Sequence, residues 1–449
     1  MPFDPLDRPS VLKAAVAGTA LAAPAAAMAA PAEEPAGPDS ARGPATRSAD
    51  GGAFARSRLS RIDDALQRHV DSGHLPGAVA LVSRRGDTHI AAAGTMAFDS
   101  ATPMRPDTIG RIASVSKPIA AAAAMTLVEE GRLRLDDPVD DWLPELADRK
   151  VLRSLNGDLK DTVPAHRPIS LRDLLTMRFG LGAIMAWPPE YPIQQAMLEA
   201  GVAPGPHLPA MSPDAYMDAI GRLPLAHQPG ERWLYDTGMH VLGILLARAS
   251  GMSLGEFLNE RLFAPLGMID TGFSVAADDL DRLATCYWTD PDSGEAVVFD
   301  EARGGRFAAP PAFESASGGL ISTVTDLLAF GTMMLDQGVY DGTRILSRAA
   351  VEVMTRDHIP PDQKGASHFY PGFWDDRGWG LGMAVVARRD GVDRQAGSFG
   401  WDGGYGTSFY CDPAEGLVGV LITQRVWDSP VPPPVLRDFW TATYQALAD

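Results

Sequence analysis

The sequence predicts an α+β fold: one antiparallel β-sheet made of N- and C-terminal strands, flanked by helices, with an all-helical subdomain. Two observations support this prediction. Strand-like runs occur towards both ends of the chain, whereas residues 136–345 are typical of helices and long loops. The 449 residues are 45% hydrophobic and 21% charged, so the chain can bury a sizeable core. Strands at the two ends bury their apolar faces by joining in one sheet with helices packed beside it.

The first 55 residues are predicted to lie outside the folded domain, which covers residues 56–449. Residues 14–30 are an apolar run of small residues that follows two basic residues and contains Ala-Met-Ala near its end, as an export signal does. Asp4 and Asp7 cancel the positive charge of such a signal, so a disordered tail rich in Ala and Pro is the alternative. We therefore expect an exported protein, with a cytoplasmic one as the alternative. No other stretch is apolar and long enough to span a membrane.

The first folded elements are expected in the order helix, strand, strand. Apolar residues recur at helical spacing over residues 57–73. Two strand-like runs follow at residues 77–86 and 88–94, and the Arg-Gly-Asp sequence between them predicts a hairpin. A third short run, at residues 109–113, leads directly into Ser114.

An Ala-rich helix is predicted after Ser114, ending at Gly131. It is apolar on nearly every face up to Val128, and a helix that is apolar all round is buried. Pro118 fits its first turn, where the N–H groups have no intrahelical partners. The sequence therefore places a serine at the start of a buried central helix.

The C-terminal part returns to strands and closes with a helix. Strand-like runs cover residues 378–389, 396–402, 405–413 and 416–425, and the final helix covers residues 434–447. Together with the N-terminal hairpin, these runs supply the predicted sheet.

Composition excludes several classes of partner and cofactor. The 39 Lys and Arg against 57 Asp and Glu give a net charge of −18, which argues against nucleic acid or an anionic membrane as partner. Cys286 and Cys411 are not at metal-ligand spacing, and two buried thiols are favoured over a disulfide. We expect no metal and no other cofactor, and the sequence leaves the oligomeric state open.

The first chemical motif is Ser114-Val-Ser-Lys117. Residues i and i+3 share one face of a helix, so the Ser114 hydroxyl and the Lys117 amine can meet. Serine is a poor nucleophile unless a neighbour takes its proton. Burial and the positive end of the helix destabilise an ammonium, which makes Lys117 a candidate base. Ser116 is the competing nucleophile, but it lacks a lysine at i+3.

Two later segments carry further candidates. Residues 229–235, Pro-Gly-Glu-Arg-Trp-Leu-Tyr, end in Tyr235, which on its own also fits a core aromatic ahead of a helix. Residues 400–407 are rich in glycine on a predicted strand, which allows close approach by a ligand or another chain. A tight hairpin is the alternative for this segment.

The order of these motifs, SxxK, then PGxxWxY, then a Gly-rich late strand, resembles the serine β-lactamase-like superfamily. That superfamily includes class C β-lactamases, D-alanyl-D-alanine peptidases and family VIII esterases. The resemblance covers nearly everything after residue 58, with supporting segments at residues 135–139, 170–176, 265–268 and 318–323. It implies a β-lactamase/transpeptidase-like fold.

The resemblance also implies roles for single residues. Ser114 resembles the acylated serine, Lys117 its partner base, and Tyr235 the tyrosine that shuttles a proton to the leaving group. The N–H groups of Ser114 and Gly404 are the implied oxyanion donors. Residues 179–211 are implied to line the cleft, although core packing explains their apolar character equally well. The implied substrate-binding residues are Trp401, Asp402, Gly403, Trp187 and Thr237.

Departures from the family pattern favour an ester as substrate. Thr237 stands where class C enzymes carry asparagine, and Trp401 stands where a β-lactamase has the lysine that helps to bind the substrate carboxylate. Both the tyrosine spacing and Trp-x-Gly are similar to family VIII esterases. His227 and His240 are interpreted as structural, because the lysine–tyrosine pair supplies the base. We expect ester hydrolysis through an acyl-serine; the alternatives are a β-lactamase or D-amino-acid peptidase, an acyltransferase to a small acceptor, and an inactive binding homologue.

Overall fold

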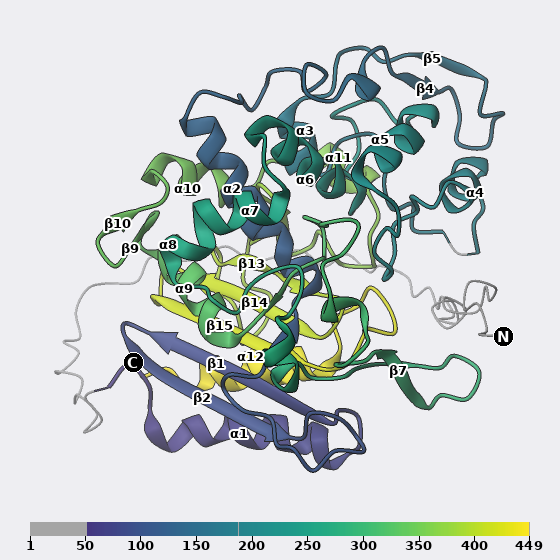
Figure 1. Ribbon diagram of the computed structural model, residues 1–449. Helices are drawn as coiled ribbons and strands as arrows, with labels where there is room; N and C mark the ends of the chain where they lie inside the picture. Colours follow the sequence, from purple (N-terminus) through teal and green to yellow (C-terminus); the bar gives the residue numbers. More distant parts are fainter. Residues whose placement is uncertain (1–51, 187, 449) are drawn as a thin grey trace, which may run out of the picture.

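The computed structural model describes residues 52–186 and 188–448, and its centre is a seven-stranded antiparallel sheet with strand order β11-β12-β13-β14-β15-β1-β2 (Figure 1). The strands are β1 Gly77–Arg84, β2 Asp87–Gly94, β11 Arg377–Trp379, β12 Ala384–Val386, β13 Phe399–Gly403, β14 Thr407–Asp412 and β15 Leu417–Thr423. β1 pairs with β15, so the N-terminal hairpin completes a sheet made by the C-terminal strands. The predicted α+β fold is confirmed.

Helices cover both faces of this sheet. Figure 1 shows α1 against β1 and β2 on one side, and the helical region on the other. The helices are α1 Arg56–Asp71, α2 Ser116–Glu129, α3 Leu171–Leu175, α4 Pro192–Glu199, α5 Pro213–Arg222, α6 Thr237–Ser250, α7 Leu254–Leu258, α8 Ala264–Leu266, α9 Val324–Leu335, α10 Arg348–Met354, α11 Pro361–Ala366 and α12 Pro434–Gln445.

The alternation of side chains along β1 divides the core into two layers. Ala78 and Val82 pack with α1 and α12, whereas Val79 and Leu81 belong to the larger core that contains α2 and α9. Successive strand residues point to opposite faces, so a strand covered on both sides is apolar almost throughout.

Helix α2 runs through the middle of the larger core layer. Its residues from Ser116 to Leu127 are all buried, as the apolar pattern predicts. The turn between β11 and β12 packs against the start of α2. There Gly382 has φ +73°, and a Cβ at this position would lie 2.9 Å from the Lys117 carbonyl oxygen.

Three details differ from the sequence prediction. The run at residues 378–389 is not one strand: it forms β11 and β12 with a turn between them. The run at residues 109–113 contributes only a two-residue strand outside the large sheet. The middle of the chain also contains short ribbons that lack a long alternating pattern in the sequence. The additional strands are β3 Gly110–Arg111, β4 Lys150–Leu152, β5 Thr162–Pro164, β6 Cys286–Thr289, β7 Ala296–Asp300, β8 Ile321–Ser322, β9 Val339–Tyr340 and β10 Thr343–Arg344.

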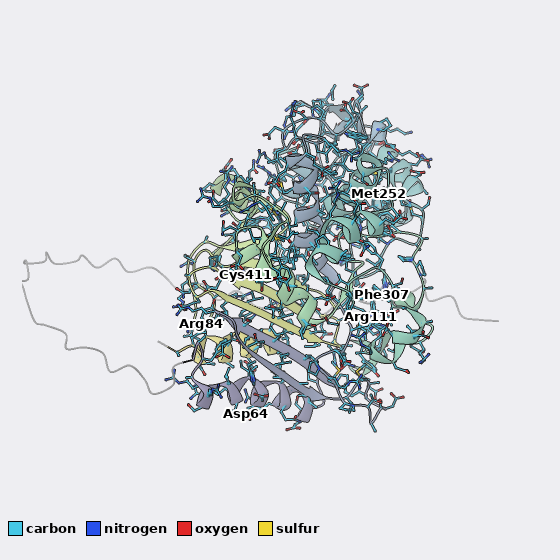
Figure 2. All side chains as sticks on the ribbon, turned by 60° about the vertical axis from the view of Figure 1, so that its left-hand side comes forward. Asp64, Arg84, Arg111, Met252, Phe307 and Cys411 are labelled. Atoms are coloured by element: carbon cyan, nitrogen blue, oxygen red, sulfur yellow. The ribbon has the colours of Figure 1, made fainter. Side chains whose placement is uncertain are left out.

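Both cysteines are buried free thiols, as the sequence favours (Cys411 is labelled in Figure 2). Burial raises the pKa of the Cys286 thiol to about 12. In the described ranges no single helix is long and apolar enough to cross a membrane. One bent pair of helices, α6 with α7–α8, reaches that length and apolar composition only when the two parts are taken together. The predicted export signal stays a prediction, because residues 1–51 lie outside the described residues. Phe54 is buried and pairs with Leu447, so the packed domain begins ahead of residue 56.

The packing of α12 on the sheet gives a stability prediction. Trp440 is 1% exposed, its ring lies over Gly419, and its indole N–H donates to Ser408 Oγ at 2.9 Å. Trp440→Ala should lower the free energy of unfolding by about 3–5 kcal/mol, because it opens a cavity between α12 and the sheet. Ile269→Ala, at a residue that is 89% exposed, should change it by less than about 0.5 kcal/mol. Urea unfolding of both variants tests this, and equal losses would contradict the packing described.

Candidate active site

Ser114 lies in a tight turn between strand β3 and helix α2. The preceding residue, Ala113, has φ +43°, a left-handed conformation that costs a residue other than glycine about 1–3 kcal/mol. Arg111 anchors the strand before the turn through a buried ion pair with Asp300. Its guanidinium carbon also lies 5.4 Å from the centroid of the Phe307 ring (Arg111 and Phe307 are labelled in Figure 2). Ser114 therefore follows a strained residue, in a turn whose incoming strand is anchored by Arg111.

Lys117 is fully buried in the first turn of α2, and its Nζ atom lies 2.8 Å from Ser114 Oγ. The i, i+3 spacing thus brings the two side chains together. Nζ also donates to the Ser317 carbonyl oxygen at 2.7 Å. By contrast, the Ser116 hydroxyl is used within the fold: it donates to the Ala113 carbonyl at 2.6 Å and accepts from the Leu320 N–H.

Tyr235 comes from a third segment, directly before α6. Lys117 Nζ lies 4.5 Å from the centroid of the Tyr235 ring. The indole N–H of Trp401, on β13, donates to Tyr235 Oη at 2.6 Å. Because an indole N–H can only donate, the tyrosine oxygen is the acceptor in this bond. Phe369 packs on the same ring at a centroid distance of 4.9 Å, so the wall here is aromatic.

The end of β13 lies against the turn that carries Ser114. A Cβ at Gly403 would come within 2.3 Å of the Ile112 carbonyl oxygen, so this approach requires glycine. A Cβ at Gly404 would meet nothing within 4 Å. The roles of the Gly404 and Ser114 N–H groups as oxyanion donors stay predictions.

The structure does not bring every predicted residue to this site. The Asp402 carboxylate points to the other face of the sheet, where it accepts from Ser408 Oγ at 2.6 Å, so the structure does not bring it to the Ser114–Lys117 pair. The alternation along β13, with Trp401 inward and Asp402 outward, explains this. Thr237 is fully buried in the first turn of α6. Trp187 lies outside the described residues.

Asp236 is a member of this cluster that the sequence reasoning did not identify. Its carboxylate lies 3.1 Å from Lys117 Nζ, accepts from the Ser317 hydroxyl, and lies 3.3 Å from His240 Nε2. Burial alone would raise the pKa of Asp236, but the Lys117 ammonium and the hydrogen bonds from His240 and Ser317 outweigh it and hold this pKa well below its usual range. The one sign of this role in the sequence is that an aspartate directly follows the motif tyrosine.

The backbone of Asp236 is itself unusual. Its angles, φ +84° and ψ −65°, and the 3.3 Å hydrogen bond from the Thr237 N–H to the Tyr235 carbonyl define a γ-turn with positive φ. This conformation is rare and strained, costing about 1–3 kcal/mol. Asp236 is also at the N-cap position of α6 without capping the helix through its side chain. The side chain is therefore directed to Lys117 instead.

Within the described residues, no group of three or more His, Cys, Asp or Glu side chains is arranged to hold a metal ion. What the cluster offers is a serine hydroxyl in contact with an amine, which itself lies against a tyrosine ring. This is the constellation of an enzyme that uses an activated serine nucleophile.

Comparison with known proteins agrees with this class. The sequence model of the beta-lactamase family matches residues 62–432, and the chain belongs to that family. The predicted superfamily is thereby confirmed.

The chain is similar to two curated proteins and one solved structure. An uncharacterized protein of Mycobacterium tuberculosis is 38% identical over 369 residues, covering 81% of this chain and 89% of the relative. Esterase EstB of Burkholderia gladioli is 31% identical over 393 residues, covering 83% and 92%. The solved structure of EstCE1, described as a hydrolase with promiscuous acyltransferase activity, superposes with a TM-score of 0.71 at 25% identity, covering 87% and 99%. The chain is thus a serine hydrolase-type enzyme.

The bond between Trp401 and Tyr235 gives a kinetic prediction with a matched control. Trp401→Phe keeps a ring but removes the N–H that donates to Tyr235 Oη, and should lower kcat/KM for an ester about tenfold, the value of one such hydrogen bond. Trp379→Phe removes a buried indole N–H that has no partner among the described residues, so kcat/KM should stay near that of the wild type. Equal losses in the two variants would show that ring packing alone matters.

Proposed function

We propose that this protein hydrolyses carboxylic esters through an acyl-serine intermediate on Ser114. The observation that carries the proposal is the 2.8 Å contact between Ser114 Oγ and Lys117 Nζ at the start of a buried helix. Tyr235 beside this pair supplies a second group able to move a proton. The esterase name of the Burkholderia relative supports the same reaction class.

The proposed reaction has two halves. Ser114 Oγ attacks the ester carbonyl as its proton passes to the Lys117/Tyr235 pair, and the N–H groups of Ser114 and Gly404 stabilise the oxyanion. The tetrahedral intermediate then collapses: the carbon–oxygen bond to the alcohol breaks, and the pair returns the proton to the leaving oxygen. Water attacks the acyl-serine in the second half, which releases the carboxylic acid and restores Ser114.

The aromatic wall around Tyr235 and Trp401 favours an uncharged ester over a substrate with a carboxylate. Trp401 is 4% exposed and surrounded by Trp379, Phe373 and Phe369. The partly exposed rings in front of them, Tyr235 and Phe369, offer apolar contact area and ring edges to a substrate. β-Lactams and peptide C-termini carry an anion that this wall does not neutralise, so a small-molecule ester is the proposed substrate.

Acyl transfer to a small acceptor is the second candidate, favoured by the promiscuous acyltransferase activity for which EstCE1 is described. Both reactions share the acyl-serine and differ in what attacks it. Product analysis with p-nitrophenyl butyrate and added butanol separates them, because transfer yields butyl butyrate in place of butyrate.

Loss of the Ser114 hydroxyl should abolish ester turnover. Ser114→Ala should lower kcat for p-nitrophenyl butyrate by about 10⁴- to 10⁶-fold, as expected when the nucleophile is removed. The wild type should be labelled at Ser114 by a fluorophosphonate, as seen by intact-protein and peptide mass spectrometry. Ser116→Ala, which removes the neighbouring hydroxyl, should still be labelled. Full turnover by Ser114→Ala would show that the nucleophile is another residue.

Ester and lactam hydrolysis can be compared on one preparation. Because Trp401 replaces a cation, kcat/KM for p-nitrophenyl butyrate should exceed that for nitrocefin by about 100-fold or more, the contribution expected of a charged contact. Both are measured by absorbance at one pH. Faster nitrocefin turnover would identify a β-lactamase instead.

A further inference from the structure

The Lys117 Nζ atom has three close oxygen neighbours. They are Ser114 Oγ at 2.8 Å, the Ser317 carbonyl at 2.7 Å and Asp236 Oδ1 at 3.1 Å. An ammonium can donate to all three. A neutral amine can donate to two of them and accept from the Ser114 hydroxyl. Both forms satisfy the hydrogen bonds, so the charges on the surrounding groups decide between them.

The hydrogen bonds around His240 assign it a neutral form. The Ser315 hydroxyl oxygen accepts from two backbone N–H groups, those of Ser317 at 3.2 Å and Gly318 at 3.1 Å. Both of its lone pairs are then in use, so its hydrogen is donated to His240 Nδ1, 3.0 Å away. Nδ1 therefore carries no proton, and the proton on Nε2 points to the Asp236 carboxylate at 3.3 Å.

A neutral His240 leaves Asp236 dependent on Lys117 for its counter-charge. Asp236 is 9% exposed, and a buried carboxylate is strongly destabilised unless a cation is paired with it. The titratable groups around the carboxylate are Lys117 from α2, His240 from α6, the adjacent Tyr235, and Tyr216 from α5, which packs on His240 at 5.6 Å between ring centroids. Among these, Lys117 is the group that can supply the positive charge.

We infer that Asp236 is a positioning residue of the acylation step: its carboxylate, oriented by Ser317 and His240, holds Lys117 as an ammonium between Ser114 and Tyr235. This inference rests on the proposed function and specifies how its proton moves. For a given number of protons on the Lys117/Tyr235 pair, the charge of Asp236 favours the ammonium with a phenolate over the amine with a phenol, because the carboxylate is in direct contact with Nζ, 3.1 Å away.

The consequence concerns which atom accepts the serine proton. As Ser114 Oγ bonds to the carbonyl carbon, its proton moves to the Tyr235 oxygen, and Lys117 keeps all three of its own. The same proton passes from Tyr235 to the alcohol oxygen when the carbon–oxygen bond breaks. The strained γ-turn has a role in this scheme, because it brings both the Tyr235 ring and the Asp236 carboxylate into contact with the Lys117 Nζ atom.

The test is the rate at which a fluorophosphonate labels Ser114 across the pH range, which reports serine activation without knowledge of the natural ester. Asp236→Asn keeps the shape and removes the charge. Its plateau rate should fall about 10- to 100-fold, the value of a hydrogen bond between charged groups. The whole pH profile should also move to lower pH, because the pair holds both of its protons less tightly without the nearby negative charge.

Each other outcome overturns the inference. A variant with a higher or unchanged plateau would show that a neutral Lys117 is the base, which Asp236 opposes. A lower plateau with an unmoved pH profile would reduce Asp236 to a structural role. If wild-type Ser114 is not labelled, the proposed function itself is wrong, whereas labelling of the wild type with no effect of Asp236→Asn removes this inference alone.

Two further variants guard against a folding artefact. Asp326→Asn is the matched control: this buried carboxylate on α9 accepts from Thr271 Oγ1 at 2.8 Å, so its loss should lower the melting temperature and leave the labelling profile unchanged. Ser317→Ala removes the hydroxyl that orients Asp236 and should slow labelling about three- to tenfold, the value of a neutral hydrogen bond, even if Asp236→Asn does not fold. Labelling of Ser317→Ala at the wild-type rate would contradict the orienting role.

Discussion

The burial of the Lys117 amine is the constraint on which the rest of the site depends. A lysine with no exposed surface has to find oxygen partners and compensating charge inside the protein. It finds them in three segments that are distant in sequence: Ser114 ahead of α2, Asp236 ahead of α6, and the Ser317 carbonyl ahead of β8. The two strained residues of the site, Ala113 and Asp236, stand next to the serine and the tyrosine that meet at this amine. Two of the three segments that meet at this nitrogen thus carry a strained residue at or beside the side chain that they present.

The sheet contributes to the site through the alternation of its side chains. β13 passes the Ser114 turn so closely that Gly403 has no room for a Cβ. Trp401 then points to Tyr235, and the next residue, Asp402, points to the opposite layer, where Trp440 of α12 shares its partner Ser408. One strand thus fixes the wall of the site on one face and anchors the C-terminal helix on the other. Because β1 pairs with β15, both ends of the chain stabilise this arrangement.

The sequence predicts the large features well, because they depend on periodic patterns. An all-apolar segment predicts α2, runs at both ends predict the sheet, and i, i+3 spacing predicts the Ser114–Lys117 contact. The features it misses depend on single conformations. No propensity indicates that Asp236 adopts a γ-turn. Its position directly before α6 suggests instead that its side chain caps the helix, which it does not do. The face to which Asp402 points follows from strand register, which a one-residue shift would reverse. The break between β11 and β12 depends on how the turn at Gly382 packs on α2.

The charges of the site bear on the kind of substrate it suits. With Lys117 matched by Asp236, the cluster carries little net positive charge, and the wall around Trp401 is aromatic. Such a site has little electrostatic attraction for an anionic substrate before reaction, so binding rests on apolar contact. In the proposed mechanism, the negative charge that develops on the carbonyl oxygen is stabilised by backbone N–H groups. A neutral ester, the substrate proposed above, fits such a site, because it needs no counter-ion in the ground state and becomes negative only during the proposed attack by Ser114.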